Sequence, residues 1–590
     1  MDDLITVPAP AATALNDAPG NGWRRKFSLV WSVPFPGGPV DMGLLLFLVL
    51  FLDVKLAIKI PVLGLTLALS APWRSFSALR AGHSLSALKR IPPFYPLIGV
   101  LAVAGWLLSR SSAPPYYDMV AGAALLFWIL CLGAAHQVRV FADRDDRETL
   151  ERTLGVFFLL NALVSVAELA RIAWEVKAFN PYLYQGLYQR YFIRTGDYIH
   201  GLTFDTSTTN AMINAFGVVY FLSRRRGWMM LCCMACLLLT GSNFTNMLLL
   251  GVLAWIFAFR SDREQRGGIV LCVLMGVIFL GKVSPQNQTY VNETLARWEH
   301  PKTHAHTDPH EGWDMEDLRR TVFARHYIDS VHNEAIAAMQ ARLAAARRDS
   351  LAAATAAQGL GAGAAAAPPP HLWTPKPSIP QPDINTPPYQ SRADTTDDQR
   401  TQIDFVTRHQ ATLVRATKPG LPLDGHVPGK LLALEDILAF YRQHPWKIVL
   451  GDGPGNFSSK LAFRAAGLGI AGGYPRRWTY IHPDFLRYHL DLFLAYFSKP
   501  KENHSLVNSP DSVFAQMLGE YGILGLALFG GTYLGFFVRR ARRADRRRGK
   551  TNAFAWPLLA LMTGAFFMGY WFEQLSIVVL FELMIYTDCV

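Results

Sequence analysis

The stretch ENHSLVNSPDSVFAQMLGEYGILGLALF, residues 502–529, closes a long hydrophilic insert, and in it a polar loop runs directly into an apolar helix. Such a junction places ionisable side chains at a membrane surface, where lipid-linked substrates present their head groups. A second stretch, GDGPGNF at residues 451–457, predicts a tight turn that directs Asn456 and Phe457. It is not a phosphate-binding P-loop, because no Gly-Lys-Ser/Thr follows its glycines. The rest of the sequence mainly indicates topology.

Apolar residues elsewhere cluster into runs that can cross a hydrocarbon layer of about 30 Å. The 590-residue chain is 51% hydrophobic and only 17% charged, unlike a typical soluble enzyme. We therefore expect an all-α polytopic membrane protein with about twelve transmembrane helices. The second, seventh and last are short enough to be re-entrant or tilted. The runs are residues 41–57, 58–72, 95–110, 117–136, 153–173, 205–222, 227–241, 244–260, 267–283, 513–538, 553–571 and 574–587.

Basic residues indicate the orientation of these helices. They gather in six segments that all fall on one side of the membrane when twelve spans are counted, and loops rich in Lys and Arg stay in the cytoplasm. We therefore expect both termini in the cytoplasm, and no cleavable signal peptide, because residues 1–22 lack an apolar core. The net charge of +12 then reflects topology and contact with anionic lipids rather than nucleic-acid binding. The segments are residues 24–26, 74–90, 139–152, 224–226, 260–266 and 539–550.

A large hydrophilic insert divides the chain. The insert contains no cysteine, so it must fold by packing without disulfides. We expect it to be mainly helical, with a disordered Gly/Ala/Pro-rich linker at residues 359–388. Residues 480–500 carry aromatics and leucines on one face, which either lies in the membrane interface or packs against the spans. The expected order is a cytoplasmic tail (1–40), nine transmembrane helices (41–283), a periplasmic domain (284–512) and three further transmembrane helices (513–590).

Four stretches occur in a fixed order around the insert. They are RTGDYIHGLTFDTSTTNAMINAF (194–216), LTGSNFTNMLLLGVLAW (239–255), GDGPGNF (451–457) and NSPDSVFAQMLGEYGILGL (508–526). In this order they resemble the O-antigen polymerase/ligase family, membrane glycosyltransferases that use undecaprenyl-diphosphate-linked glycans. The chain departs from the family pattern twice. Asn243 replaces the usual arginine, and Asp511 stands where the family commonly has a catalytic-type histidine.

The resemblance implies a multi-pass protein of the bacterial inner membrane with its active site on the periplasmic face. The expected function is polymerisation of an O-antigen, exopolysaccharide or capsule, by transfer of a glycan from undecaprenyl diphosphate onto a lipid-linked repeat unit. Expected partners are this lipid-linked oligosaccharide, membrane lipids, a flippase and a chain-length regulator, with no nucleic acid. The alternatives are a ligase that moves glycan onto lipid A-core or protein, a polysaccharide transporter or flippase, and a scaffold of an export complex.

The catalytic candidates lie at the junction. Asp511 can accept a proton from a sugar hydroxyl as an imidazole does, and His504 is the alternative base. Ser-Pro-Asp-Ser is also a helix N-cap sequence, so Asp511 or Ser512 alternatively caps the tenth span. Glu520, about two turns into an apolar helix, is costly there unless it is paired, and we count it among the catalytic candidates.

A diphosphate leaving group needs fixed cations, and guanidinium binds it bidentately. Arg194 is the first candidate for this role, and surface salt bridging is the alternative for each arginine. No metal or other cofactor is expected. The candidate substrate-binding residues are Arg194, Arg190, Arg464, Arg476, Arg477, Asn210, Asn243, Asn456, His482 and Asn508.

Overall fold

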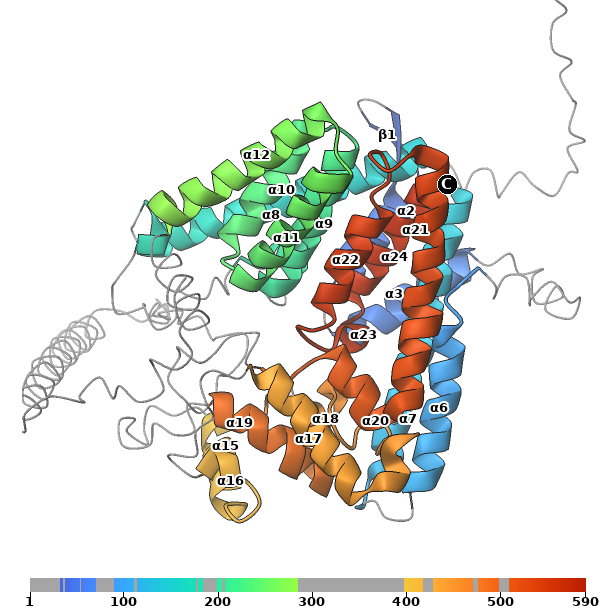
Figure 1. Cartoon of the computed structure of the whole chain (residues 1–590), viewed down its shortest axis with the longest axis vertical. Helices are drawn as coiled ribbons and strands as arrows, with labels where there is room; N and C mark the ends of the chain where they lie inside the picture. Colours follow the sequence, from blue (N-terminus) through green and yellow to red (C-terminus); the bar gives the residue numbers. More distant parts are fainter. Residues whose placement is uncertain are drawn as a thin grey trace, which may run out of the picture. The chain divides into compact units, whose positions relative to one another are not determined.

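The structure of the chain is a computed structural model (Figure 1), and it is predominantly helical. All residues that it describes belong to one compact unit, made of Met1–Val291 and Pro377–Val590. The predicted linker at 359–388 lies outside the described residues. These are residues 32–35, 38–52, 55–70, 90–110, 114–176, 179–183, 199–203, 207–284, 397–417, 428–470, 476–497 and 509–589.

The first part of the chain forms a hairpin followed by helices. Strands β1 (Ser32–Phe35) and β2 (Gly38–Asp41) pair antiparallel, with Phe35 opposite Gly38. All of this hairpin except Asp41 falls within the segment predicted as a tail, residues 1–40. Asp41 then caps the next helix, because its carboxylate accepts two backbone N–H groups of the first turn. The helices are α2 (Met42–Phe51), α3 (Leu56–Ser70), α6 (Phe94–Ser109), α7 (Tyr117–Arg144) and α8 (Arg147–Val176).

A second group of helices surrounds α9 (Ser207–Ser223), which is buried along nearly its whole length. It packs against α10 (Gly227–Leu239), α11 (Asn243–Phe259) and α12 (Arg263–Ile278), and against helices of the C-terminal part. The turn η4 (Phe279–Val283) extends α12. Two short 3-10 turns, η1 (Pro181–Leu183) and η3 (Gly201–Thr203), precede α9.

The C-terminal part begins with a long helical segment and ends in three shorter helices. Aromatic side chains pack where these helices meet α6: the ring of Phe94 lies 5.5 Å from that of Tyr533 and 5.2 Å from that of Phe572. The elements are α20 (Val513–Leu528), η9 (Phe529–Leu534), α21 (Gly535–Arg548), α22 (Ala555–Ala565), α23 (Trp571–Gln574) and α24 (Ser576–Cys589).

Part of the described insert packs into an apolar core. Phe405, Phe463 and Phe485 are buried together there, and the same core takes in Tyr570 from the C-terminal part. Of the predicted segment 480–500, the described part buries Phe485, Leu490 and Phe493 in this core. Tyr480 instead stacks on Tyr117 of α7, so this part packs within the protein. The elements are α15 (Asp397–Arg408), α16 (Val414–Thr417), α17 (Gly429–Gln443), η5 (Pro445–Ile448), α18 (Lys460–Ala465), η6 (Arg476–Trp478), η7 (Phe485–Leu490) and α19 (Asp491–Phe497).

A helix lies in each predicted span, and four helical segments are long and apolar enough to cross a membrane. The all-α prediction is therefore confirmed, and these four segments indicate a multi-pass membrane protein. The helices in the other spans have 10 to 17 residues, which at 1.5 Å per residue is at most about 26 Å. Twelve crossings are accordingly not shown. The four segments are Tyr117–Arg144, Arg147–Trp174, Arg263–Val283 and Val513–Arg548.

The basic segments predicted to lie on one side contact one another in the structure. Arg260 Nη1 lies 3.0 Å from Asp545 Oδ2. Arg540 donates to the backbone carbonyl of Arg90 at 3.1 Å. Arg260 is buried and Asp545 is largely buried, with side chains 7% and 19% exposed. These contacts bring together three of the six basic segments, residues 74–90, 260–266 and 539–550, at one end of their helices.

Candidate functional site

The two stretches singled out in the sequence meet at a break in α20. Gly522 has φ 68° and ψ −167° inside this helix, so it interrupts the helical hydrogen bonds around it. The GDGPGNF turn fills the gap. The Asp452 amide donates to the Gly519 carbonyl at 3.0 Å, and the Gly453 amide donates to the Glu520 carbonyl at 3.0 Å. Because buried carbonyls need such partners, the turn completes the broken helix.

Three glycines give the turn its shape. Gly451, Gly453 and Gly455 have φ values of 74°, 94° and 77°, in a region that L side chains rarely adopt. Residues 451–459 are all buried, so the turn is an internal scaffold. Three polar clusters surround it, and we name them the Asp452, His489 and Glu520 clusters.

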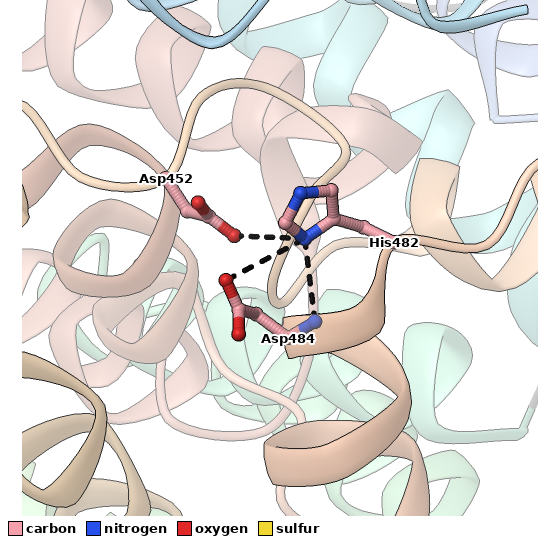
Figure 2. A group of neighbouring side chains, drawn as sticks. All are labelled: Asp452, His482 and Asp484. Carbon is pink, nitrogen blue, oxygen red and sulfur yellow. Dashed lines mark hydrogen bonds and ion pairs between the residues drawn. The ribbon is translucent and has the colours of Figure 1, made fainter. Parts of the chain in front are cut away.

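The Asp452 cluster contains Asp452, Lys447, His482 and Asp484. Figure 2 shows the His482 ring pointing at both carboxylates, with Nδ1 3.1 Å from Asp452 Oδ2 and 3.7 Å from Asp484 Oδ2. The Lys447 ammonium contacts Asp452 and lies 3.3 Å from Asp484 Oδ2. Burial raises the pKa of Asp484 above its ordinary value, and the charge of Asp452 raises it further.

Three members of this cluster could hold a metal ion. The ligand atoms of Asp452, His482 and Asp484 lie within 4.8 Å of one another, and imidazole and carboxylate are ordinary zinc ligands. Lys447, however, already supplies a positive charge to both carboxylates. With its ammonium in place, the cluster acts as an internal ion-pair network that fixes the turn to the start of η7.

The His489 cluster contains His489, Ser458, Asp511 and Tyr570. The Tyr570 hydroxyl lies 2.7 Å from His489 Nε2, 3.0 Å from the Ser458 hydroxyl and 3.1 Å from Asp511 Oδ1. His489 Nε2 is 3.4 Å from the same carboxylate oxygen. The Asp511 side chain is 22% exposed, whereas that of His489 is 2% exposed. Asp511 is therefore the member that a ligand can reach.

The hydrogen bonds of this cluster form a chain. Tyr570 donates to Asp511, which leaves the phenol oxygen able to accept the Nε2 proton of His489. A carboxylate open to solvent is thereby connected to a buried imidazole. Carboxylate and imidazole side chains act as general bases in enzymes, and a hydrogen-bonded neighbour orients the base and stabilises the proton it takes up.

The segment before α20 leaves the Asp511 carboxylate available for this cluster. Ser512, and not Asp511, caps α20, because the Ser512 hydroxyl accepts the Ala515 amide at 2.9 Å. The Lys430 amine donates to the backbone carbonyls of Ser509, at 3.0 Å, and of Asp511. Burial lowers the pKa of Lys430 to about 8, against the opposing charge of Asp511. The capping alternative for Asp511 is thus excluded by the structure.

The Glu520 cluster lies inside the protein. The carboxyl group of Glu520 faces the Ser459 hydroxyl and the amides of two residues of the turn. Gln516, one helical turn earlier, donates to Glu573 at 2.5 Å. Glu520 is 1% exposed, so this predicted catalytic residue is buried in a different cluster from Asp511.

Two predicted substrate-binding residues support the turn instead. Asn456 is fully buried: its Nδ2 donates to the Asp452 carbonyl at 2.8 Å, and its Oδ1 accepts the Tyr480 hydroxyl at 2.6 Å. His482 belongs to the Asp452 cluster. Both side chains are committed to contacts within the protein, so the structure gives them a positioning role.

Asn210 belongs to a buried network elsewhere. Its Oδ1 accepts from Asn161 and Asn214, each at 2.8 Å, and its Nδ2 donates to the carbonyl of Ile199 at 2.9 Å. The Asn210 side chain is fully buried. It therefore anchors the segment before α9 and offers no atom to a substrate in this structure. Asn243 is the first residue of α11 and is half-buried.

The predicted arginines are placed only in part. Arg464 lies on α18, where its charge acts on Glu573. Arg477 is exposed and lies over the Trp478 ring, 4.4 Å from its centroid. Arg476 belongs to η6, and its side chain is outside the described part. Four candidates lie outside the described residues altogether: Arg190, Arg194, His504 and Asn508.

The sequence analysis missed His489, Tyr570, Ser458 and Lys430. His489 sits among aromatic residues with the spacing of an ordinary buried helix face. Tyr570 falls at the end of a predicted span. The only sequence signal for its neighbourhood is the polar pair Glu573–Gln574 between two apolar runs.

Comparison with protein-family models, curated proteins and solved structures finds no match to this chain. The geometry of the site is therefore the basis for its function. The partly exposed Asp511 carboxylate accepts a hydrogen bond from the Tyr570 phenol and lies 3.4 Å from the His489 imidazole, beside the glycine turn.

Proposed function

We propose that this chain is a polysaccharide polymerase of the bacterial inner membrane, which transfers a glycan from undecaprenyl diphosphate onto a lipid-linked repeat unit at the periplasmic face. The His489 cluster is the observation that carries this proposal. The family that the sequence resembles commonly has a histidine where this chain has Asp511. Here the imidazole of His489 lies 3.4 Å from that aspartate, so the same chemistry is supplied from a different segment.

In the proposed reaction, the acceptor hydroxyl attacks the anomeric carbon of the donor glycan. A carbon–oxygen bond forms there, the bond from that carbon to the diphosphate breaks, and the bonding electrons leave with the diphosphate. Asp511 accepts the hydroxyl proton, while Tyr570 and His489 orient the carboxylate and stabilise its protonated form. Guanidinium groups neutralise the diphosphate, a role assigned from the sequence first to Arg194 and then to Arg190.

The position of the site along α7 supports the periplasmic assignment. At the start of this helix, the Tyr117 ring stacks on Tyr480 of the insert with centroids 5.6 Å apart. At its end, Arg144 pairs with Asp145 in one of the basic segments. The helix has 28 residues and is therefore about 42 Å long. If the basic segments are cytoplasmic, the GDGPGNF turn and its clusters lie on the opposite side of the membrane.

The proposal is tested with Asp511→Asn, His489→Gln and Tyr570→Phe in cells that lack the chromosomal gene. Polysaccharide chain length is read from gels and protein level from immunoblots. We expect Asp511→Asn to reduce polymer by about 100-fold or more, because general-base catalysis typically contributes that much. Asp118→Asn is the control, because it makes the same change at an exposed aspartate at the start of α7 that pairs with Arg110 at 3.0 Å.

Three outcomes separate the alternatives. Normal polymer from all three variants at normal protein level would refute the proposed site. Loss of polymer in His504→Ala, with full activity in Asp511→Asn, would assign the base to His504. Loss of glycan transfer to lipid A-core, with lipid-linked polymer still made, would identify a ligase in place of a polymerase.

A further inference from the structure

An apolar stripe runs along one side of α17. It consists of Leu431, Leu434 and Leu438, which are 53%, 44% and 48% exposed, and we name it the leucine stripe. Residues three and four positions apart lie on the same side of a helix. Two exposed charged residues of the same helix, Glu435 and Arg442, border the stripe. An exposed apolar face with a charged edge is typical of a helix that lies in a membrane interface.

The other side of α17 attaches this helix to the rest of the protein. Phe440 is fully buried, and its ring lies 5.0 Å from that of Phe457 in the glycine turn. The Tyr441 hydroxyl donates to the backbone carbonyl of Leu518 in α20. Core packing therefore uses the side that carries Phe440, and the leucine stripe is a second apolar face. Exposed apolar patches mark interaction sites in many proteins.

The leucine stripe continues into a segment that is long and apolar enough to cross a membrane. Trp446 and Val449, which follow α17, are exposed, and so are Ile523 and Leu524 of α20. The Leu524 amide donates to the Val449 carbonyl at 3.2 Å, so the two exposed apolar surfaces adjoin. Ile523 and Leu524 belong to the candidate membrane-crossing segment Val513–Arg548. Their exposed side chains face lipid when this segment crosses the bilayer.

We propose that α17 lies in the membrane interface, with the leucine stripe among the lipid acyl chains and Trp446 at the level of the head groups. Tryptophan is enriched at this level of membranes. After the break at Gly522, Ile523 and Leu524 begin the part of the helical segment that ends in the basic residues 539–548. The leaflet that receives α17 is therefore the one farther from these basic residues.

A lipid surface fits this face better than a protein partner does. The exposed apolar side chains extend from α17 through Val449 to α20, and a bilayer covers all of them without a gap. A protein bound to the leucine stripe would leave the adjoining surface of α20 to be covered separately. Arg442 can bury its apolar stem beside the stripe and extend its guanidinium to the lipid phosphates.

The placement of α17 has a consequence for the segment before α20. Lys430 is the second residue of α17, and its amine donates to the backbone carbonyls of Ser509 and Asp511. A helix held in the interface therefore holds the Asp511 segment at the membrane surface. The inference does not rest on the proposed glycosyl transfer, because contact with lipid is measured directly and without substrate.

Spin labels on single introduced cysteines test the proposal. Leu431→Cys, Leu434→Cys and Leu438→Cys are made in the full chain, labelled with a nitroxide and reconstituted into vesicles of phosphatidylethanolamine and phosphatidylglycerol. Dissolved oxygen concentrates in hydrocarbon and a neutral nickel chelate concentrates in water. We expect the label at each leucine position to collide more often with oxygen than with the chelate. The wild type, labelled in the same way, gives the background from the native cysteines.

Gln443→Cys is the matched control on the same helix. Gln443 is exposed and follows Leu434 by about two and a half turns, so it lies on the opposite side of α17. Its label is expected to collide more often with the chelate. The same preference for the chelate at the leucine positions would place the stripe in water and overturn the proposal.

A protein partner gives a different result from lipid. Labels at the leucine positions that neither reagent reaches in vesicles would show that a second copy or another protein covers the stripe, which also overturns the proposal. The Tm of each labelled variant is compared with that of the wild type to confirm folding. The three leucine positions report on the same face independently, so the test stands if one variant fails to fold.

Discussion

The backbone of Gly451 lies directly against the backbone of Gly522. A Cβ atom at Gly522 would be 2.6 Å from the Gly451 nitrogen and 2.4 Å from the Val449 carbonyl oxygen. A Cβ atom at Gly451 would be 2.3 Å from the carbonyl carbon of Glu520. Each glycine also has a positive φ. The turn and the broken helix therefore fit together only where both residues lack a side chain.

Gly522→Ala is expected to destabilise the protein. The substitution combines a backbone conformation that costs about 1–3 kcal/mol for an L residue with a backbone clash that no side-chain rotation relieves. Thermal unfolding in detergent measures the change. Gly530→Ala is the control, because a Cβ there meets nothing within 4 Å and φ is not positive. Equal Tm values for the two variants would contradict the fit described above.

Ser512→Ala and Asp511→Asn are expected to have opposite effects. Ser512 is the N-cap of α20, so its loss should cost about 1 kcal/mol of stability while polymer formation continues. Asp511 does not cap the helix, so Asp511→Asn should leave Tm nearly unchanged and abolish most polymer. Tm and polymer are measured on the same two variants. A large fall in Tm for Asp511→Asn would mean that the carboxylate is structural.

The sequence indicates the turn and the junction because their signals are local. Alternating glycines and a polar-to-apolar boundary can be read within a few residues. His489 and Tyr570 leave no such pattern, since Tyr570 is 81 positions from His489 and 59 from Asp511. Only the fold brings them together. The sequence therefore located the carboxylate but not the groups that surround it.

Helix ends were predicted less well than apolar runs. Hydropathy identifies segments that avoid water, but it does not identify the residue at which tertiary packing ends a helix. The first predicted span, residues 41–57, contains α2, which ends at Phe51.

Asn210 shows that the sequence also does not reveal the hydrogen-bond partners of a polar side chain. A polar residue in an apolar helix suggests function from sequence alone, yet tertiary neighbours use all of its hydrogen-bonding atoms.

Asn210→Leu is accordingly expected to destabilise the protein. It leaves the Ile199 carbonyl without the Asn210 amide and removes the Oδ1 acceptor that the amides of Asn161 and Asn214 share, although the Asn214 amide keeps the backbone carbonyl of residue 210 at 2.9 Å. A buried polar group left unpaired costs about 1–3 kcal/mol. Lower Tm and less folded protein on size-exclusion chromatography are the expected results. Asn246→Ala is the control, because Asn246 Oδ1 has no hydrogen-bond partner among the described residues. Normal Tm with lost activity would instead support a substrate-binding role for Asn210.

Lys430 should give the stability a pH dependence of known sign. Its pKa in the folded protein is about 8, below its ordinary value of 10.5, because burial disfavours the charged amine. Between these two values the unfolded chain holds a proton that the folded chain has released, so the contribution of Lys430 to stability rises with pH across this window. Below it, both states are protonated and the contribution is constant.

Lys430→Met removes this contribution while it keeps a side chain of similar length. The wild type should therefore gain about 1–2 kcal/mol relative to the variant between about pH 7 and pH 10, less than the full pKa shift implies, because the half-buried amine keeps part of its hydration. The measurement is Tm for both proteins across that range. Lys447→Met is an informative comparison, since the Lys447 ammonium is matched by two carboxylates. A stability difference between wild type and Lys430→Met that stays constant with pH would show that the amine keeps its ordinary pKa. A loss of wild-type stability relative to the variant as pH rises would show that the carbonyls of Ser509 and Asp511 stabilise the charged amine and raise its pKa.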